Sequence, residues 1–390
     1  MDAGGLVLRD ADDGAHGRAL AALVRRVAAE AGAARVAIGA ATASAHTFAA
    51  LSAAFARGDL ATWGYDDAYA TRASEPGALL AGARSVICVA IPYGRVDGAP
   101  AARAAAPLAG RVSNYAWSRD YHRTVRAILD RIAAALDTAA GAAVTRVVCD
   151  TAPLAERAFA RRAGLGWVGK HTNLIAPGLG SFVFLGEIVT TLGLAYDAPL
   201  KQTCGSCTRC VVACPTGALR GDYTIDATRC ISDLTQRTDA IPREVRPLLG
   251  DWVWGCDLCQ LVCPPTRRAR PVIDAVFAPA GADAATPSLL ELLALRSATF
   301  KRRYRDTAMG WRGAAVLRRN AAVALGNARD RATVPALTRA LVCDAHPLVR
   351  GHVAWALGRI GSPAARRALA ARQASELDAS VLEEIAAALA

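Results

Sequence analysis

CGSCTRCVVACP, residues 204–215, places four cysteines within eleven residues, and a proline follows the fourth. A second group, CDLCQLVCP at 256–264, adds three cysteines, and Cys230 lies alone between the two groups. Together they supply eight thiols, the number that two cubane iron–sulfur clusters require. The cysteines therefore indicate a two-cluster electron-transfer unit in the middle of the chain.

The spacing CxxCxxCxxxCP resembles that of bacterial ferredoxins, in which the fourth cysteine of the run binds the other cluster. By this resemblance the two cysteine groups exchange one ligand each. The implied ligands are Cys204, Cys207, Cys210 and Cys263 for one [4Fe-4S] cluster and Cys214, Cys230, Cys256 and Cys259 for the other.

Structural zinc and disulfides are the alternative uses of these cysteines. Zinc prefers two separated CxxC pairs, and a CxxCxxC triplet has one thiol too many for half of such a site. The first residues, MDAGGLVLRDADDG, lack the basic and apolar regions of a signal peptide. A reducing cytoplasm is therefore expected, where disulfides are rare. Cys88, Cys149 and Cys343 stand singly in apolar stretches, as buried free thiols do.

Length and charge suggest a multidomain enzyme with a polyanionic partner. A chain of 390 residues has room for two or three domains, and no stretch is apolar enough for a membrane span. The net charge is +12, and residues 264–390 hold 19 Arg or Lys against 10 Asp or Glu. Such a basic C-terminal third favours nucleic acid, with a merely solubilising Arg-rich surface as the alternative.

Two further patterns complete the expected architecture. AVALG at 322–326 recurs as AWALG at 354–358 and AAALA at 386–390, a period of 32 that is typical of stacked HEAT-like helix pairs. Short β-branched runs at 34–41, 84–94 and 145–154 alternate with helical stretches at 118–136 and 154–163, which predicts an α/β sandwich. The expected domains are α/β (1–195), ferredoxin-like (196–270) and helical repeats (271–390).

Four motifs carry a resemblance to a known family. They are DTAPLAERAFARRAGLGWVGKHTNLI at 150–175, GRVSNYAWSRDYH at 110–122, RCISDLTQR at 229–237, and the cysteine pattern, followed by repeats after LRRNAAVALGN. Together they resemble epoxyqueuosine reductases along nearly the whole chain. The resemblance implies an oxidoreductase that uses cobalamin and two [4Fe-4S] clusters. Its substrate would be epoxyqueuosine at the wobble position of tRNA, reduced to queuosine.

The family pattern is not matched everywhere. Pro265 and Thr266 replace the tryptophan and asparagine of a CPWN ending, Asp233 replaces a tyrosine, and Arg237 stands where an acid is expected. An hGxM segment near Trp63 also lacks its methionine. These departures leave open a related cobalamin and iron–sulfur reductase, similar to reductive dehalogenases, that acts on a small molecule. A non-enzymatic electron carrier on a helical scaffold is the other alternative.

The resemblance also implies roles for individual residues. Asp150 would be the acid that protonates the departing oxygen, with a pKa raised by the cofactor's surroundings; the alternative is that it caps a helix beginning near Pro153. A protein axial ligand from His171 is not favoured. Cobalamin contacts are expected from Arg72, Ser113, Tyr115, Asp150, Lys170, His171, Asn173, Ser232 and Asp257, and tRNA phosphate contacts from Arg267, Arg268, Arg302, Arg303, Arg318 and Arg319.

The expected partners follow from the same chemistry. Electrons would come from an external low-potential donor, because reducing cobalamin requires a very low reduction potential. The reduction potentials of [4Fe-4S] clusters extend to about −700 mV. A monomer in the cytoplasm is expected, with tRNA carrying epoxyqueuosine as the substrate and no membrane partner.

Overall fold

A four-stranded antiparallel sheet forms the centre of the N-terminal part. The computed structural model describes residues 5–60, 63–94, 108–269, 275–281 and 283–390. The strands β1 (Arg35–Ala40), β2 (Ser85–Pro92), β7 (Val183–Thr190) and β4 (Thr145–Val148) lie in the order β1-β2-β7-β4. The strands expected at 34–41 and 84–94 are confirmed, whereas the third ends early because the chain turns sharply at Asp150.

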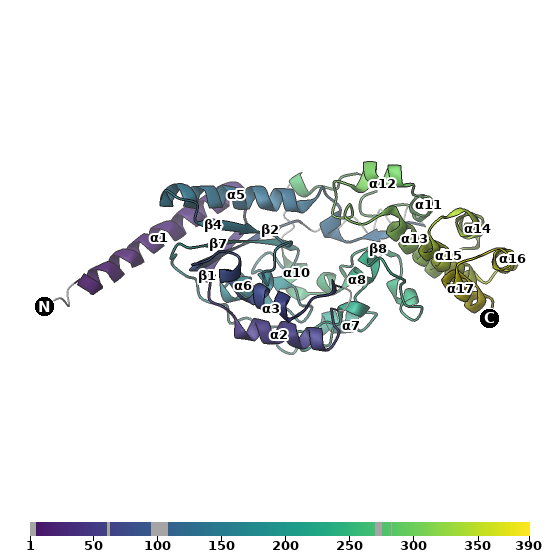
Figure 1. Cartoon of the computed structure of the whole chain (residues 1–390), viewed down its shortest axis with the longest axis horizontal. Helices are drawn as coiled ribbons and strands as arrows, with labels where there is room; N and C mark the ends of the chain where they lie inside the picture. Colours follow the sequence, from purple (N-terminus) through teal and green to yellow (C-terminus); the bar gives the residue numbers. More distant parts are fainter. Residues whose placement is uncertain (1–4, 61–62, 95–107, 270–274, 282) are drawn as a thin grey trace.

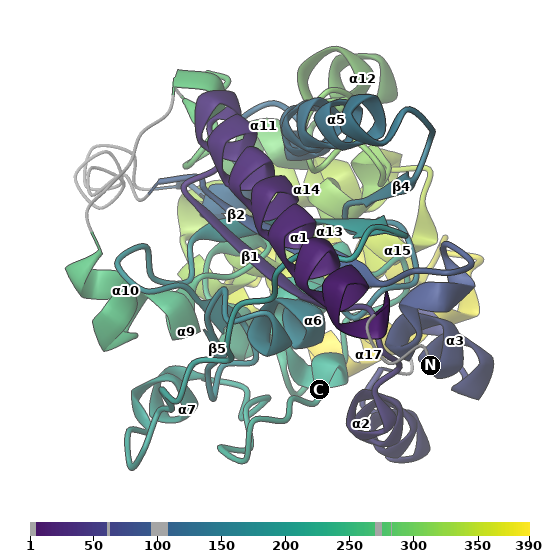
Figure 2. The ribbon, with the colours of Figure 1, turned by 90° about the vertical axis from the view of Figure 1, so that its left-hand side faces the viewer.

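Helices cover both faces of this sheet. The long helices α1 (Gly5–Ala31) and α5 (Tyr121–Ala140) lie on one face, and α6 (Glu156–Arg162) packs on the other (Figure 2). Alternate strand residues point to opposite faces, so Ile87 contacts the α5 side while Cys88 faces α6. Gly186 of β7 leaves the room that Leu129 of α5 fills, since a Cβ there would lie 2.7 Å from its Cδ1. The result is the expected α/β sandwich.

The cysteine-rich segment follows the sheet and is built from short helices. These are α7 (Arg209–Ala213), α8 (Ile231–Gln236), α9 (Leu258–Leu261) and α10 (Pro264–Arg268). The strand β8 (Trp252–Trp254) pairs in parallel with β3 (Arg111–Val112) from the N-terminal part. A second small hairpin joins β5 (Trp167–Val168) to β6 (Leu174–Ile175). The strand pair β3–β8 thus joins the cysteine segment to chain that lies about 140 residues earlier in the sequence.

Stacked helices form the C-terminal part, at the opposite end of the molecule from α1 (Figure 1). They are α11 (Leu289–Leu293), α12 (Ser297–Tyr304), α13 (Ala314–Ala328), α14 (Val334–Cys343), α15 (Pro347–Ile360), α16 (Pro363–Gln373) and α17 (Ala379–Leu389). The repeated segments fall in α13, α15 and α17. Gly326 faces Ala356, and Gly358 faces Ala388, where a Cβ would lie 2.9 Å from the opposing Cα in both cases. Small residues therefore let these helices approach closely, as the 32-residue period predicts.

Two helices, α2 (Ala45–Ala56) and α3 (Asp67–Ser74), complete the N-terminal part below the sheet in Figure 1. Each begins with a side-chain cap: the Thr47 amide donates to Ser44 Oγ, and the Tyr69 amide donates to Asp66 Oδ1. In the portion of the chain that the structure describes, no helix has the length and apolar character to cross a bilayer. The domain boundary expected between residues 270 and 271 lies outside the described residues.

Candidate active site

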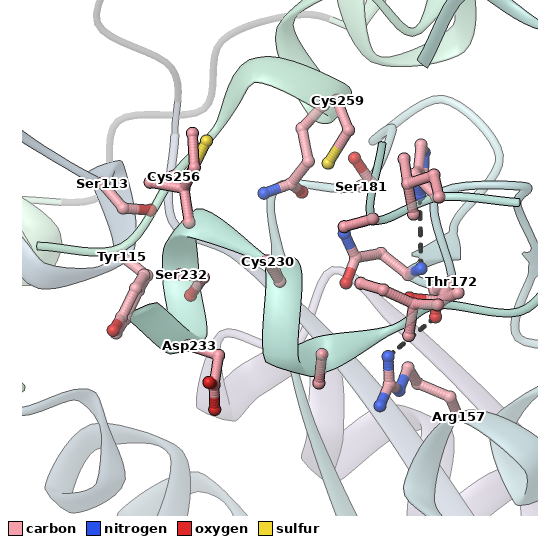
Figure 3. Close-up of a pocket in the computed structure, with 18 of the residues that line it drawn as sticks. Ser113, Tyr115, Arg157, Thr172, Ser181, Cys230, Ser232, Asp233, Cys256 and Cys259 are labelled. Atoms are coloured by element: carbon pink, nitrogen blue, oxygen red, sulfur yellow. Dashed lines mark hydrogen bonds between the residues drawn. The ribbon is translucent and has the colours of Figure 1, made fainter. Parts of the chain in front are cut away.

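A pocket of about 530 Å³ opens between one edge of the sheet and the cysteine segment. Its wall combines the loop after β4, the turn between β5 and β6, the start of β7 and the helix α8. Figure 3 shows Ser113 and Tyr115 on one side, Ser232 and Asp233 below, and Thr172 and Arg157 opposite them. Most of the lining is apolar, and the polar groups come from segments that are far apart in the sequence, as in a cofactor or substrate site.

Asp150 stands at the mouth of this pocket in a left-handed backbone conformation, with φ of +56°. Its amide donates to Glu156 Oε1 at 2.6 Å, which supports the loop. The helix α6 begins at Glu156 with Ala155 as its N-cap and without a side-chain cap. Asp150 is therefore not a helix cap, and the capping alternative is wrong.

His122 and Tyr121 from the start of α5 contact the Asp150 carboxylate. His122 Nε2 lies 3.2 Å from Asp150 Oδ2, and the Tyr121 hydroxyl donates to the same oxygen at 3.3 Å. The other ring nitrogen of His122 is 2.6 Å from Asp120 Oδ1. An imidazole between two carboxylates is held in its charged form.

This arrangement sets the protonation state at neutral pH. Hydrogen bonds to Asp120 and then Asp150 raise the pKa of His122 from 6.5 to about 9. The hydrogen bond from His122 lowers the pKa of Asp150, whose side chain is 60% exposed. The rise in the pKa of Asp150 that the sequence suggested is therefore not found here, because a cation lies next to the carboxylate. The available proton sits on His122.

The turn between β5 and β6 places a neutral histidine in the wall. His171 is 3% exposed, and burial lowers its pKa to about 4. Its Nδ1 accepts from the Asn173 amide at 3.2 Å, while its buried Nε2 has no hydrogen-bond partner among the described residues. Gly169 permits this turn, since a Cβ there would lie 2.9 Å from the His171 ring. The pocket thus contains a buried polar atom that a ligand could satisfy.

The residues expected to contact cobalamin divide into two groups. Arg72 is exposed on α3 and lies outside the lining, Lys170 Nζ instead donates to the Gly205 carbonyl at 2.9 Å, and Asp257 is buried behind the wall. None of these three residues lines the pocket, and their contact with cobalamin stays a prediction. The residues that do line the pocket are Ser113, Tyr115, Asp150, His171, Asn173 and Ser232.

Asp257 nevertheless shapes the wall. Its carboxylate accepts from the Ser113 hydroxyl at 2.6 Å and from the Asn114 amide at 2.8 Å. These bonds fix the turn that carries Tyr115, whose hydroxyl accepts from Trp254 Nε1 at 2.9 Å. Asp257 and Lys170 are therefore positioning residues: they hold segments of the wall rather than face its interior.

The eight cysteines occupy two places relative to the pocket. None of them forms a disulfide, and four of them line the pocket: Cys214, Cys230, Cys256 and Cys259. These are the four that the ferredoxin pattern assigns to one cluster. Two of them, Cys256 and Cys259, are drawn beside Cys230 in Figure 3.

The remaining four cysteines lie outside this lining. Burial raises the pKa of the Cys263 thiol, and charge on the neighbouring Cys204 and Cys207 would raise it further. Cys263 therefore lies near the first cysteine group despite its distance in sequence. Within the described ranges, no three His, Cys, Asp or Glu side chains converge on the place of a single metal ion.

Three departures from the family pattern meet in one cluster at the pocket rim. Arg237 pairs with Asp233 at 2.7 Å, one turn apart on α8, and Trp63 Nε1 donates to Asp233 Oδ1 at 2.9 Å. Both charged side chains are almost fully buried, 7% and 5% exposed. An acid at 233 and a base at 237 thus compensate each other. Thr266, another departure, accepts from the Ser181 amide at 3.1 Å.

The arginines expected to bind tRNA differ in availability. Arg319 is fully buried, and its guanidinium donates to the carbonyls of Leu234 and Arg237 at 2.9 and 2.8 Å, so the expected phosphate contact is wrong. Arg318 is engaged by Asp344 at 2.6 Å and is 15% exposed. Arg303 pairs with Asp283 and Glu291. The exposed members are Arg267, Arg268 and Arg302.

Sequence reasoning missed several functional candidates. His122 ends the GRVSNYAWSRDYH motif, so its place in a family motif was the available signal, but its contact with Asp150 required the fold. The only sign of Trp63 in the sequence was that its segment departs from the family pattern. Its ring stacks on Trp311, with centroids 5.9 Å apart, and joins the N-terminal part to the helical repeats.

Family models match three parts of the chain. A 4Fe-4S double cluster binding domain matches residues 203–266, the epoxyqueuosine reductase QueG domain (DUF1730) matches 73–151, and HEAT repeats match 313–390. These matches coincide with the cysteine segment, the N-terminal part and the stacked helices. They support iron–sulfur clusters over zinc for the eight thiols.

Curated relatives cover most of the chain. An epoxyqueuosine reductase of Bacillus anthracis is 34% identical over 323 residues, which is 83% of this chain and 84% of the relative. One from Salmonella typhimurium is 40% identical over 288 residues, 73% of this chain and 74% of the relative.

Solved structures agree with these relatives. An epoxyqueuosine reductase bound to an epoxyqueuosine-modified tRNA-Tyr stem loop matches with a TM-score of 0.86 at 31% identity, covering 94% of this chain and 96% of that one. The Bacillus subtilis enzyme, with a catalytic aspartate loop swung out of its active site, matches with a TM-score of 0.87, 31% identity and coverage of 94% and 97%. Similarity of this extent in sequence, domain order and fold shows that the chain belongs to the epoxyqueuosine reductase family.

Proposed function

We propose that this chain reduces epoxyqueuosine in tRNA to queuosine, with cobalamin in the pocket and electrons passing through two [4Fe-4S] clusters. One observation carries the proposal: the pocket wall that holds Asp150, which His122 contacts, also holds Cys214, Cys230, Cys256 and Cys259. A proton donor and an electron donor therefore face the same cavity. The crossed ligand assignment and the three-domain division expected from the sequence form part of this proposal.

The pocket suits a large, mostly apolar cofactor with polar edges. Its volume lies within the usual range for ligand sites, and its lining is mainly apolar. Ser113, Tyr115, Asn173 and Ser232 could bind polar substituents, and the unpartnered Nε2 of His171, which carries the ring hydrogen because Nδ1 accepts from the Asn173 amide, could donate to one. Cobalamin, when bound and reduced, would supply the nucleophile that the chemistry needs. The protein's own contribution is orientation and protons.

The proton chemistry follows from the Asp150 and His122 pair. Removing the epoxide oxygen consumes two electrons and two protons, leaves an alkene and releases water. His122 holds a proton at neutral pH and lies 3.2 Å from Asp150, which faces the pocket. A ligand that excludes water from Asp150 would favour the neutral carboxyl and draw that proton across. A loop with a catalytic aspartate moves in the Bacillus subtilis relative, which supports a catalytic role for the Asp150 loop.

The tRNA partner is proposed by analogy with the stem-loop complex of a relative. Arg302 on α12 is the exposed candidate for a phosphate contact among the arginines of the helical repeats expected to bind tRNA. An external low-potential electron donor, a monomeric state and a cytoplasmic location complete the proposal.

A two-part experiment tests this function. The protein is reconstituted anaerobically with iron, sulfide and cobalamin, and its absorption is followed during reduction; epoxyqueuosine-tRNA is then added and its nucleosides are analysed by mass spectrometry. About eight iron and eight sulfide per chain are expected, and Cys230→Ala should lose one cluster. Queuosine should appear only with cobalamin. Reduction of a small halogenated compound without any queuosine would instead support the dehalogenase-like alternative.

A further inference from the structure

A second hollow lies on the cysteine segment, between α7 and α9, and shares no lining residue with the pocket. Its lining alternates apolar and basic residues: Thr208, Arg209, Val212, Ala213, Val262 and Arg267. Of the four cysteines next to it in the chain, Cys207, Cys210 and Cys263 belong to the group that does not line the pocket, and only Cys214 belongs to the group that does. The hollow therefore lies beside the outer cysteine group, and the pocket beside the inner one.

Exposed apolar side chains lie in and beside this hollow. Val212 is 82% exposed, although it is a β-branched residue with no polar group, and Leu261 on α9 is 38% exposed. Exposed apolar side chains with a charged rim are typical of a surface that a protein partner covers. Exposure of these apolar side chains to water is unfavourable, whereas their burial by a partner is favourable.

The rim is basic and lacks acidic neighbours. Residues 198–221 and 258–270 contain no Asp or Glu. Arg209, Arg267 and Arg268 are exposed and form no ion pair with any described residue, in contrast to Arg220, which pairs with Asp59 at 2.5 Å. Uncompensated cations around exposed apolar side chains complement an acidic protein surface.

We propose that this hollow is the docking surface for a small acidic one-electron carrier protein. Each encounter would oxidise the carrier by one electron and reduce the outer cluster, held by Cys204, Cys207, Cys210 and Cys263, by one. Two encounters supply the two electrons that the deoxygenation consumes. The inference rests on the proposed function for the clusters, but the docking surface itself can be tested by binding alone.

RNA is the other polyanion that a basic surface could attract, and the position of the hollow argues against it. In both Figure 1 and Figure 2, α7 and α10 lie apart from α12, where Arg302 is exposed. The arginines expected to bind tRNA therefore do not form one surface. Arg267 belongs with Arg209 and Val212, and an exposed valine offers no aromatic face on which a base could stack.

The test uses the full-length protein and flavodoxin as the acidic carrier. Flavodoxin binding is measured by calorimetry at low and moderate salt, and cluster reduction is measured by stopped-flow absorbance. The variants are Arg209→Glu combined with Arg267→Glu, and Val212→Glu alone; Arg302→Glu is the matched control. Reduced methyl viologen, a small cation, serves as the reductant that needs no docking surface.

We expect wild-type affinity for flavodoxin to fall with salt, and both test variants to bind roughly tenfold more weakly or worse. Reduction by methyl viologen and iron content should stay unchanged, and Arg302→Glu should bind flavodoxin like the wild type. The proposal is overturned if flavodoxin binding to the wild-type protein does not depend on salt, or if the test variants bind flavodoxin as tightly as the wild type. It is also overturned if the test variants no longer bind the tRNA stem loop but still bind flavodoxin. Missing clusters would refute the proposed function instead, and iron analysis shows this separately.

Discussion

At the scale of single residues, the pair of Asp150 and His122 determines where the proton is held. Asp150 alone would be an ordinary exposed carboxylate, and His122 alone would titrate near neutrality. Together with Asp120 they form a cluster of three charges, because each carboxylate favours the charged form of His122 and His122 favours the ionised form of each carboxylate. The left-handed backbone at Asp150 brings its carboxylate to this position.

The first prediction concerns the acid. Asp150→Asn keeps the size and a hydrogen-bond acceptor but cannot carry the proton, so queuosine formation should fall by at least about 10²-fold. Both clusters and cobalamin binding should persist, because Asp150 is not among the proposed cluster ligands and does not cap α6. Single-turnover nucleoside analysis measures the rate, and absorption spectra verify the cofactors. Near-normal turnover would assign the proton to another group, such as Tyr115.

The second prediction concerns pH. The pKa of His122 is raised to about 9, so the pair stabilises the fold fully below the ordinary value of 6.5, and this contribution is lost as pH rises through about 9. Because the pKa of Asp150 is lowered, the pair is also lost when Asp150 becomes protonated, which happens only as pH falls below 3.8. The rate should therefore decline above about pH 9, and His122→Gln should be slower and lack that decline. A His122→Gln profile identical to wild type would exclude His122 as the proton source.

At the scale of elements, α8 shows how a departure from the family pattern is tolerated. Asp233 and Arg237 are one helical turn apart, so the two replacements form one buried ion pair rather than two separate defects. Removing one partner of a buried pair leaves a charge without compensation, which costs about 3–5 kcal/mol. The pair also holds Trp63 at the pocket rim.

The third prediction uses this pairing. Arg237→Glu restores the family's acid but places two buried acids one turn apart, so it should lower the free energy of unfolding by roughly 3 kcal/mol or more. Adding Asp233→Tyr, which restores the other family residue, should recover much of the loss. Denaturant unfolding of both single variants and the double variant gives the coupling energy. Additive losses would show that the two positions do not compensate each other.

The helix α13 binds the cysteine segment through adjacent buried polar residues. Asn320 Nδ2 donates to the carbonyls of Thr235 and Val253 at 2.7 and 2.8 Å, and Arg319 donates to three further carbonyls. Burial lowers the pKa of Arg319 to about 9. The LRRN motif therefore joins two parts of the molecule.

The fourth prediction follows from this role. Arg319→Leu leaves buried carbonyls without donors, each costing about 1–3 kcal/mol, so stability should fall by several kcal/mol. Thermal unfolding measures the change, and Arg367→Leu, an exposed substitution on α16, is the control that should change little. If Arg319→Leu leaves stability unchanged but weakens tRNA binding, Arg319 contacts a phosphate, as the sequence predicted.

At the scale of the whole molecule, positive charge is divided between different tasks. Some arginines join parts of the chain, as Arg246 does through Glu384 of α17 at 2.7 Å. Others are exposed on separate surfaces, near the outer cysteines and on α12. Net charge alone therefore overstates the area available for tRNA.

The fifth prediction concerns that tRNA surface. Arg302→Ala should weaken binding of an epoxyqueuosine-modified stem loop and reduce the slope of log affinity against log salt by about one, because one phosphate contact is lost. Arg367→Ala, on α16, a helix at the far end of the helical repeats in Figure 1, should leave both unchanged. Fluorescence anisotropy at several salt concentrations gives the slopes. Equal slopes for Arg302→Ala and wild type would place the phosphate contacts elsewhere.

The sequence by itself determined the features whose chemistry is local. Eight cysteines at ferredoxin spacing, a 32-residue helical period and short β-branched runs identified the cysteine segment, the stacked helices and the sandwich, because spacing and periodicity depend only on neighbours along the chain. The motif around Asp150 was recognisable for the same reason.

Only the tertiary structure decided how those residues act. The state of Asp150 depends on His122, 28 residues earlier, and the availability of Arg319 depends on carbonyls more than 80 residues away. Burial and pair electrostatics are set by neighbours in space, which a single sequence does not display. The same reason separates Arg267 from Arg302, two cations alike in the sequence that the fold places on different surfaces.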